Sequence, residues 1–154
     1  MRVRTNKLLR ALGFMFSTYF ADWEVKPGYK KEYVSLWSDW LGKENYDKLD
    51  EVTEKDWGRF NNWIRLLSEK FAIELVNCEN ESLQEITDIE SVLSNYEESM
   101  NKDASLFLKI VLPELGCIIS EEWDYTYIIW HKENGAVKTL APYIQEAGLK
   151  NFHD

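Results

Sequence analysis

Several residue patterns on which active sites depend are missing from this sequence. Its seven glycines are scattered, so there is no glycine-rich loop to bind phosphate. Neither a G-x-S-x-G elbow nor an H-E-x-x-H motif occurs, which excludes the common serine-hydrolase and zinc-protease signatures. His131 and His153 are the only histidines, and His153 lies one residue from the C-terminus, where chains are often loosely held. We therefore expect no enzyme activity and no cofactor.

Cysteines and long apolar runs are also scarce. Cys78 and Cys117 are too far apart for a C-x-x-C metal or redox motif, and we expect two buried thiols in a reducing cytoplasm. No apolar run reaches the ~18 residues of a transmembrane helix. The basic start of the chain loosely resembles a signal peptide, but Ser17 and Thr18 interrupt its apolar run, which favours a core helix. These features predict a soluble cytoplasmic protein without a membrane partner.

The net charge of −9 is unevenly distributed. Residues 1–31 carry seven basic and two acidic side chains, whereas residues 74–124 carry thirteen acidic and two basic ones. Such a block attracts cationic partners and repels nucleic acid, whose binding needs a basic surface. We therefore expect no nucleic-acid partner. The simpler interpretation is that the acidic block only keeps the protein soluble.

Apolar spacing predicts a mostly helical α+β fold in a single globular domain, residues 1–154. The spacing indicates helices over about 5–23, 29–41 and 53–75, the last with Thr53 and Asp56 as a capping pair. Ser82 to Glu85 matches a capping box and predicts a fourth helix reaching Met100. Acidic side chains on that helix would form one exposed face.

The pattern changes near residue 103, where a subdomain boundary is conceivable. Residues 105–112 fit either a helix or a buried strand; we favour a helix that Pro113 and Gly116 terminate. Residues 117–120 and 125–130 have the β-branched and aromatic character of strands, and residues 136–147 that of a helix. The predicted architecture is four or five helices, then a small β-hairpin and a C-terminal helix.

Two candidate chemical sites can be drawn from the sequence. Cys117 and His131 could form a nucleophile–base pair if their strands are neighbours, although both also suit ordinary strand positions. Glu121, Glu122 and Asp124 with His131 could hold a divalent cation. Successive strand residues point to opposite faces, so not all of these groups would converge. We expect no metal site and no catalytic residues.

The segment Glu121, Glu122, Trp123, Asp124 and Tyr125 is the better candidate for a partner-binding site. It places two large amphipathic aromatic residues among three carboxylates at a predicted hairpin tip. Trp and Tyr are enriched in interface hot spots, and opposite charge across an interface speeds encounter. The alternative is that Trp123 packs into the core. The other tryptophans lie at helical spacing and suit the core: Trp37, Trp40, Trp57 and Trp63.

The last third of the chain resembles the immunity proteins of bacterial polymorphic toxin systems, including contact-dependent growth inhibition. The residues concerned lie between positions 113 and 149: Pro113-Glu-Leu-Gly116, Glu122-Trp-Asp-Tyr-Thr-Tyr-Ile-Ile-Trp-His131 and Leu140-Ala-Pro-Tyr-Ile-Gln-Glu-Ala-Gly-Leu149. The resemblance implies a tight complex with one cognate toxin domain, often a basic nuclease, and no catalytic residues. An acidic protein is suited to occupying a cationic cleft.

Our leading hypothesis is therefore an inhibitory protein that neutralises a cognate, cationic toxin domain. A second hypothesis is a small enzyme that uses Cys117 and His131 or a carboxylate–metal pair. A third is a structural or adaptor subunit, which would expose a large apolar patch.

Overall fold

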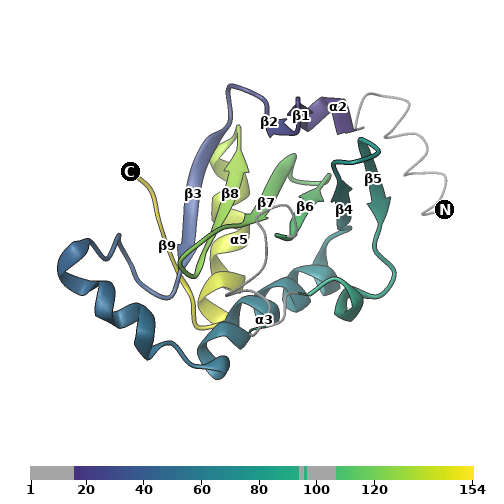
Figure 1. Ribbon diagram of the computed structural model, residues 1–154. Coiled ribbons are helices and arrows are strands. Elements are labelled where there is room, and N and C mark those ends of the chain that lie inside the picture. The colour runs from purple at the N-terminus through teal and green to yellow at the C-terminus, as the bar shows by residue number, and fades with distance from the viewer. Residues whose placement is uncertain (1–15, 94–95, 97–106) are drawn as a thin grey trace.

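A computed structural model describes residues 16–93, Tyr96 and residues 107–154. Its centre is a seven-stranded antiparallel sheet with the strand order β5-β4-β6-β7-β8-β3-β9 (Figure 1). The strands are β3 (Lys30–Ser35), β4 (Glu74–Asn77), β5 (Ser82–Glu85), β6 (Lys109–Leu112), β7 (Cys117–Glu121), β8 (Thr126–His131) and β9 (Lys150–Phe152). Two helices, α3 (Glu54–Lys70) and α5 (Asn134–Glu146), lie on one face of this sheet.

The remaining elements are short. The helix α2 (Phe16–Tyr19) leads into a small hairpin of β1 (Phe20–Ala21) and β2 (Glu24–Val25). The 3₁₀ helices are η1 (Lys43–Glu51) and η2 (Ile89–Ser91). No helix in the described part of the chain is long and apolar enough to cross a membrane.

The predicted mostly helical architecture is wrong, because strands of a large sheet replace parts of three expected helices. Residues 30–35 of the expected second helix form β3, and the expected capping box at 82–85 is strand β5. In β3 the consecutive residues Tyr33 and Val34 are both buried. A strand covered on both faces loses the alternation that distinguishes it from a helix, so apolar spacing misassigned it.

Residues 105–112 show the same ambiguity. Residues 105–106 lie outside the described chain, but 109–112 form β6, with Ile110, Val111 and Leu112 all buried. Pro113 and Gly116 do not terminate a helix. They form the β6–β7 turn, in which Leu115 N–H donates to the Leu112 carbonyl and Gly116 has a φ of 61°.

Four other predictions are confirmed: helices at 53–75 and 136–147 and strands at 117–120 and 125–130, each with shifted ends. Thr53 and Asp56 cap α3 reciprocally, with Asp56 N–H donating to Thr53 Oγ1 at 3.2 Å and Thr53 N–H to Asp56 Oδ2 at 3.1 Å.

The ends of two predicted helices lie outside the described residues. Within the described part, the helix expected to reach Trp23 ends at Tyr19, and the hairpin follows it. A helix was expected from Ser82 to Met100, but the described residues 82–93 contain strand β5 and the 3₁₀ helix η2 instead. Residue 103, near the predicted subdomain switch, is not described. Strand β4 before it pairs with β6 after it, so both parts of the chain share one sheet.

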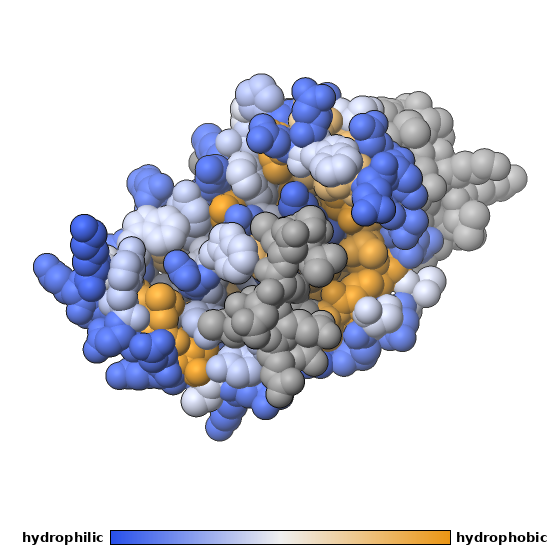
Figure 2. Space-filling view, in the orientation of Figure 1, coloured by the Kyte–Doolittle hydropathy of each residue, from blue (hydrophilic) through white to orange (hydrophobic). Residues whose placement is uncertain are grey.

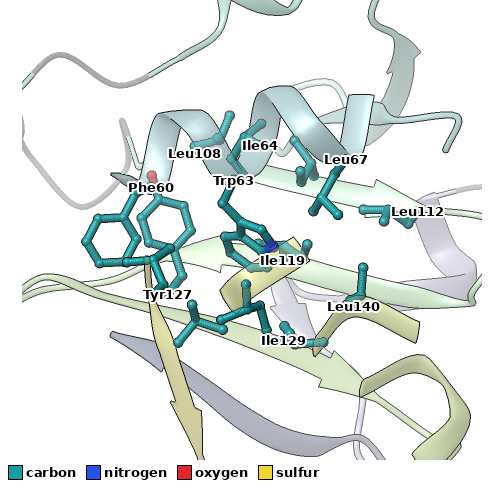
Figure 3. Packing of buried hydrophobic residues seen from close by; sticks show 14 of the residues in the cluster. Phe60, Trp63, Ile64, Leu67, Leu108, Leu112, Ile119, Tyr127, Ile129 and Leu140 are labelled. Carbon is teal, nitrogen blue, oxygen red and sulfur yellow. The ribbon is translucent and has the colours of Figure 1, made fainter. Parts of the chain in front are cut away.

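The main core lies between the sheet and the helices α3 and α5 (Figure 3). From α3, Phe60 stacks on Tyr127 of β8, with ring centroids 4.9 Å apart and an interplanar angle of 12°. Trp63, Ile64 and Leu67 continue this face, and all are fully buried. Burial of each such side chain stabilises the fold by about 1.5–3 kcal/mol. The helical spacing seen in the sequence is therefore the side of α3 that faces the sheet.

The described residues cover only part of the opposite face of the sheet. Phe16, Tyr19 and Phe20 pack on Leu83, Val111 and Ile118, over the half of the sheet that carries β5, β6 and β7. In Figure 1 the helix α5 lies behind the sheet, and the α2–β1–β2 segment lies across its upper edge. The other half of this face, formed by β8, β3 and β9, is where a groove opens.

Candidate functional site

The five residues predicted to contact a partner divide into an inward and an outward group. Glu121 is buried at the end of β7, where its Oε1 accepts a hydrogen bond from Leu108 N–H at 2.9 Å. Tyr125 is also buried, packed edge-on against Trp57 at 6.0 Å between ring centroids. Both therefore hold the hairpin in place and do not offer surface to a partner. Glu122, Trp123 and Asp124 remain on the outside.

These three outward residues form one wall of a cavity of about 490 Å³ on the open half of the sheet, here called the aromatic groove. Its floor is the outer face of β3, β8 and β9. Its other wall is the segment between β3 and α3, which includes η1. The groove is lined by Tyr33, Ser35, Trp37, Asp39, Trp40, Leu41, Gly42, Tyr46, Leu49, Glu122, Trp123, Asp124, Thr126, Ile128 and Phe152.

Large aromatic side chains of this groove are unusually open to solvent. Trp40, Tyr46 and Trp123 are 52%, 58% and 53% exposed. Figure 2 shows an apolar strip among hydrophilic side chains at the end of the molecule where η1 lies. A folded protein gains little by leaving such surface in water, and exposed apolar patches commonly mark binding sites.

Trp40 is held rigidly although half of it is exposed. Its ring lies edge-on to Tyr33 at 4.5 Å and to Phe152 at 5.1 Å between centroids. Its indole Nε1–H donates to Asp154 Oδ1 at 2.8 Å, and the Tyr33 hydroxyl donates to Asp154 Oδ2 at 3.4 Å. Burial and the neighbouring Asp154 raise the pKa of Tyr33, so its phenol stays protonated and keeps donating.

The opposite wall is fixed in a similar way. Trp123 packs edge-on against Phe107, with centroids 4.6 Å apart. Glu122 Oε2 accepts from the Ser120 hydroxyl at 2.7 Å, and the Ser120 oxygen in turn accepts from Trp130 Nε1–H at 2.9 Å. Side chains fixed before binding lose less rotamer entropy when a partner arrives.

The groove is acidic throughout. Asp39, Glu122 and Asp124 are its charged lining residues, and Asp154 adds a carboxylate beneath Trp40. Neither Lys nor Arg occurs among the described residues that line it. Carboxylates next to exposed indole faces favour a cationic group, because ammonium and guanidinium ions are attracted to both.

The Cys117–His131 pair lacks the geometry of a nucleophile and its base. Residues Ile118 and Trp130 are register partners, so Cys117 and His131 lie on neighbouring strands. In the described chain no hydrogen bond joins them; His131 Nδ1–H instead donates to the Glu133 carbonyl at 3.2 Å. The Cys117 side chain is fully buried, and burial raises its thiol pKa to about 12, which disfavours the reactive thiolate.

The carboxylates near His131 do not converge either. Among the described residues, no group of three or more His, Cys, Asp or Glu side chains is placed to hold a metal ion. Glu121 points to Leu108 and Glu122 to Ser120. The alternation of side chains along a strand separates them, as expected from the sequence.

Half of the aromatic groove was not predicted from the sequence. Of the four tryptophans assigned to the core, Trp57 and Trp63 are buried, but Trp40 is half exposed and Trp37 is intermediate. A signal was present: Ser38, Asp39, Gly42 and the polar residues after them indicate a loop at this point. A tryptophan beside a loop is a better candidate for a contact residue than one within a helix.

We find no family model, no curated protein and no solved structure that matches this chain.

Proposed function

We propose that this protein binds a cationic protein partner in the aromatic groove and thereby inhibits it, as an immunity protein neutralises its toxin. The observation that carries the proposal is the combination of three half-exposed aromatic side chains with a lining in which, among the described residues, the only charges are carboxylates. Tryptophan and tyrosine held rigidly at the centre of a contact dominate binding energy, while charge complementarity steers encounter.

The chemistry of the groove defines the part of the partner that enters it. A lysine or arginine side chain can lie against the Trp40 or Trp123 ring while its charge meets Asp39, Glu122 or Asp124. Arginine fits better, since its planar guanidinium stacks on indole and binds carboxylates through two hydrogen bonds. A basic nuclease, whose cleft is built to bind phosphate, offers such side chains, and blocking them would stop its activity.

Binding is tested with the protein encoded by the neighbouring reading frame, produced as an inactive variant. We expect a 1:1 complex that Trp40→Ala and Trp123→Ala each weaken by about 30-fold or more, as hot-spot residues do. Trp23→Ala is a matched control, because Trp23 is 52% exposed but lies in the turn of the β1–β2 hairpin. Isothermal titration calorimetry measures all four affinities.

Inhibition is tested by co-expression with the active neighbouring protein. Wild type and the Trp23→Ala variant should protect the cells, and the Trp40→Ala/Trp123→Ala double variant should not. Equal affinity of all variants would show that the partner binds outside the aromatic groove. Absence of any complex would refute the proposal. Circular dichroism of each variant separates lost binding from lost folding.

A further inference from the structure

A second cavity, of about 760 Å³, lies at the other end of β3 and β8 from the η1 side of the groove and has the opposite charge character. The cavity is formed by the first residues of β3, the last residue of β8, Val137 and Lys138 of α5, and the two residues after β9. We call it the lysine cavity. It is lined by Tyr29, Lys30, Lys31, Glu32, Tyr33, His131, Val137, Lys138, His153 and Asp154.

Three lysines contribute to the lining of this cavity in a chain whose net charge is −9. Lys30 and Lys31 are consecutive in β3 and point to opposite faces, so Lys30 shares the face of its register partner His131. Lys30, Lys31 and Lys138 form no ion pair with any described residue; Lys31 Nζ lies over the Trp130 ring, 4.9 Å from its centroid. The excess of acidic side chains already favours solubility. Solubility alone therefore does not require lysines that lack a described carboxylate partner to gather around the lysine cavity. They leave a local site that attracts anions.

The two carboxylates of the lysine cavity are already satisfied within the fold. Glu32 is 5% exposed; it accepts from Asn151 Nδ2 at 2.7 Å and from His153 Nδ1 at 3.1 Å. Asp154 accepts from Trp40 and Tyr33, on the groove side. These hydrogen bonds hold the C-terminal strand and its neighbours but leave both carboxylates charged, so the lining carries three lysine ammonium groups against two carboxylates.

His131 adds a directional group. It is 5% exposed, and because a carbonyl oxygen can only accept, its Nδ1 must donate the proton in the contact with Glu133. This leaves Nε2, for which the described residues supply no hydrogen-bond partner, as the ring atom available to a ligand. In the neutral ring Nε2 accepts from a hydroxyl, and in the charged ring it donates to an anion.

We propose that the lysine cavity binds a small molecule through a compact, multiply charged oxyanion such as a phosphoryl group. Lysine ammonium ions are strong point-charge donors to phosphate, and charge-assisted hydrogen bonds are about twice as strong as neutral ones. The volume lies in the range of small-molecule sites, roughly 300–1,000 Å³. The lysine cavity adjoins the proposed partner contact, since Tyr33 lines both and Asp154 accepts from Trp40 of the groove.

Calorimetry with inorganic pyrophosphate tests the proposal at constant ionic strength. We expect saturable 1:1 binding that the Lys30→Ala/Lys138→Ala variant weakens about tenfold or more, because it loses two charge-assisted contacts. The control is Lys55→Ala/Lys70→Ala, which removes the same charge from exposed positions on α3. It should bind as wild type does.

The His131 ring provides a second readout. Its side-chain nuclear magnetic resonance signals should shift in proportion to pyrophosphate bound in wild type, and the Lys30→Ala/Lys138→Ala variant should need about tenfold more pyrophosphate for the same shift. Absence of saturable binding at about 10 mM pyrophosphate, where even a millimolar site is filled, would refute the proposal. So would equal losses in the two double variants, since that outcome would show a general effect of net charge.

Discussion

Individual aromatic residues of this protein take two distinct roles. Trp57 and Trp63 are buried against the sheet, whereas Trp40 and Trp123 are fixed by ring contacts and hydrogen bonds yet remain half exposed. The residue type is the same in each case. The difference is whether another helix or strand covers the ring. The surroundings of a ring depend on residues far away in the chain, as the hydrogen bond from Trp40 to Asp154 illustrates.

The two cysteines should differ sharply in reactivity. Cys117 is fully buried with its thiol pKa raised to about 12, whereas Cys78 is partly exposed. We expect iodoacetamide at pH 8 to alkylate Cys78 in the native protein and to leave Cys117 unmodified, because alkylation needs an accessible thiolate. Mass spectrometry of peptides, with a urea-unfolded sample in which both react, measures this. Rapid native labelling of Cys117 would revive the Cys–His hypothesis.

At the scale of elements, α3 is the part of the fold that local sequence specifies best. The capping pair marks where α3 begins, and the helical spacing of its apolar residues starts at the same point. Both signals therefore predict the same helix. The hairpins are less well specified. The β1–β2 turn uses Asp22 and Trp23 at φ values of 53° and 69°, positions at which Asn-Gly is the usual signal.

The α3 cap gives a stability prediction that depends on pH. Hydrogen bonding from Thr53 lowers the pKa of Asp56, so its ionised form stabilises the fold. Asp56→Ala should lower the free energy of unfolding by about 1 kcal/mol at pH 7. The loss should shrink as the pH falls through the lowered pKa of Asp56, because protonation removes the same contribution from wild type.

Urea unfolding at pH 7 and pH 3 measures this difference. Glu54→Ala is the matched control, since Glu54 is also acidic and lies in the first turn of α3. It keeps the capping contact and should cost less at pH 7. An effect of Asp56→Ala that does not change with pH would show that the charge of Asp56 is not what stabilises the helix.

At the scale of the whole molecule, charge is sorted into regions. The aromatic groove is lined only by acidic charges among the described residues, while the lysine cavity near the start of β3 gathers lysines. The sheet brings these regions together from segments that are distant in sequence. Long-range attraction by the acidic region would act on the encounter with a cationic partner rather than on the final contacts.

Association with the proposed partner should therefore depend strongly on salt. We expect the association rate constant to fall about tenfold or more between 0.02 and 0.5 M salt, because the screening length shortens from about 20 to about 4 Å. The dissociation rate constant should change much less. Stopped-flow tryptophan fluorescence measures both. Trp123→Ala should mainly raise the dissociation rate, whereas Asp124→Asn should mainly lower the association rate.

Features that depend on only a few neighbouring residues could be predicted from the amino-acid sequence. These are the helix α3 with its Thr53–Asp56 cap, the strands β7 and β8, the acidic region, and the hairpin tip between these strands that includes Trp123. Each depends on local propensity or spacing. The sequence also shows directly that the glycine-rich phosphate loop, the G-x-S-x-G elbow and the H-E-x-x-H motif are absent.

Other features depend on contacts in the folded chain: residues 30–35 form a strand, Glu121 and Tyr125 point inward, and Trp40 and Trp123 line the same groove. The physical reason is that strand pairing and burial are set by distant partners. β3 becomes a strand because β8 and β9 flank it, and because Tyr33 and Val34, on its two faces, are both buried. Information of that kind is spread over the whole chain and does not appear in any single segment.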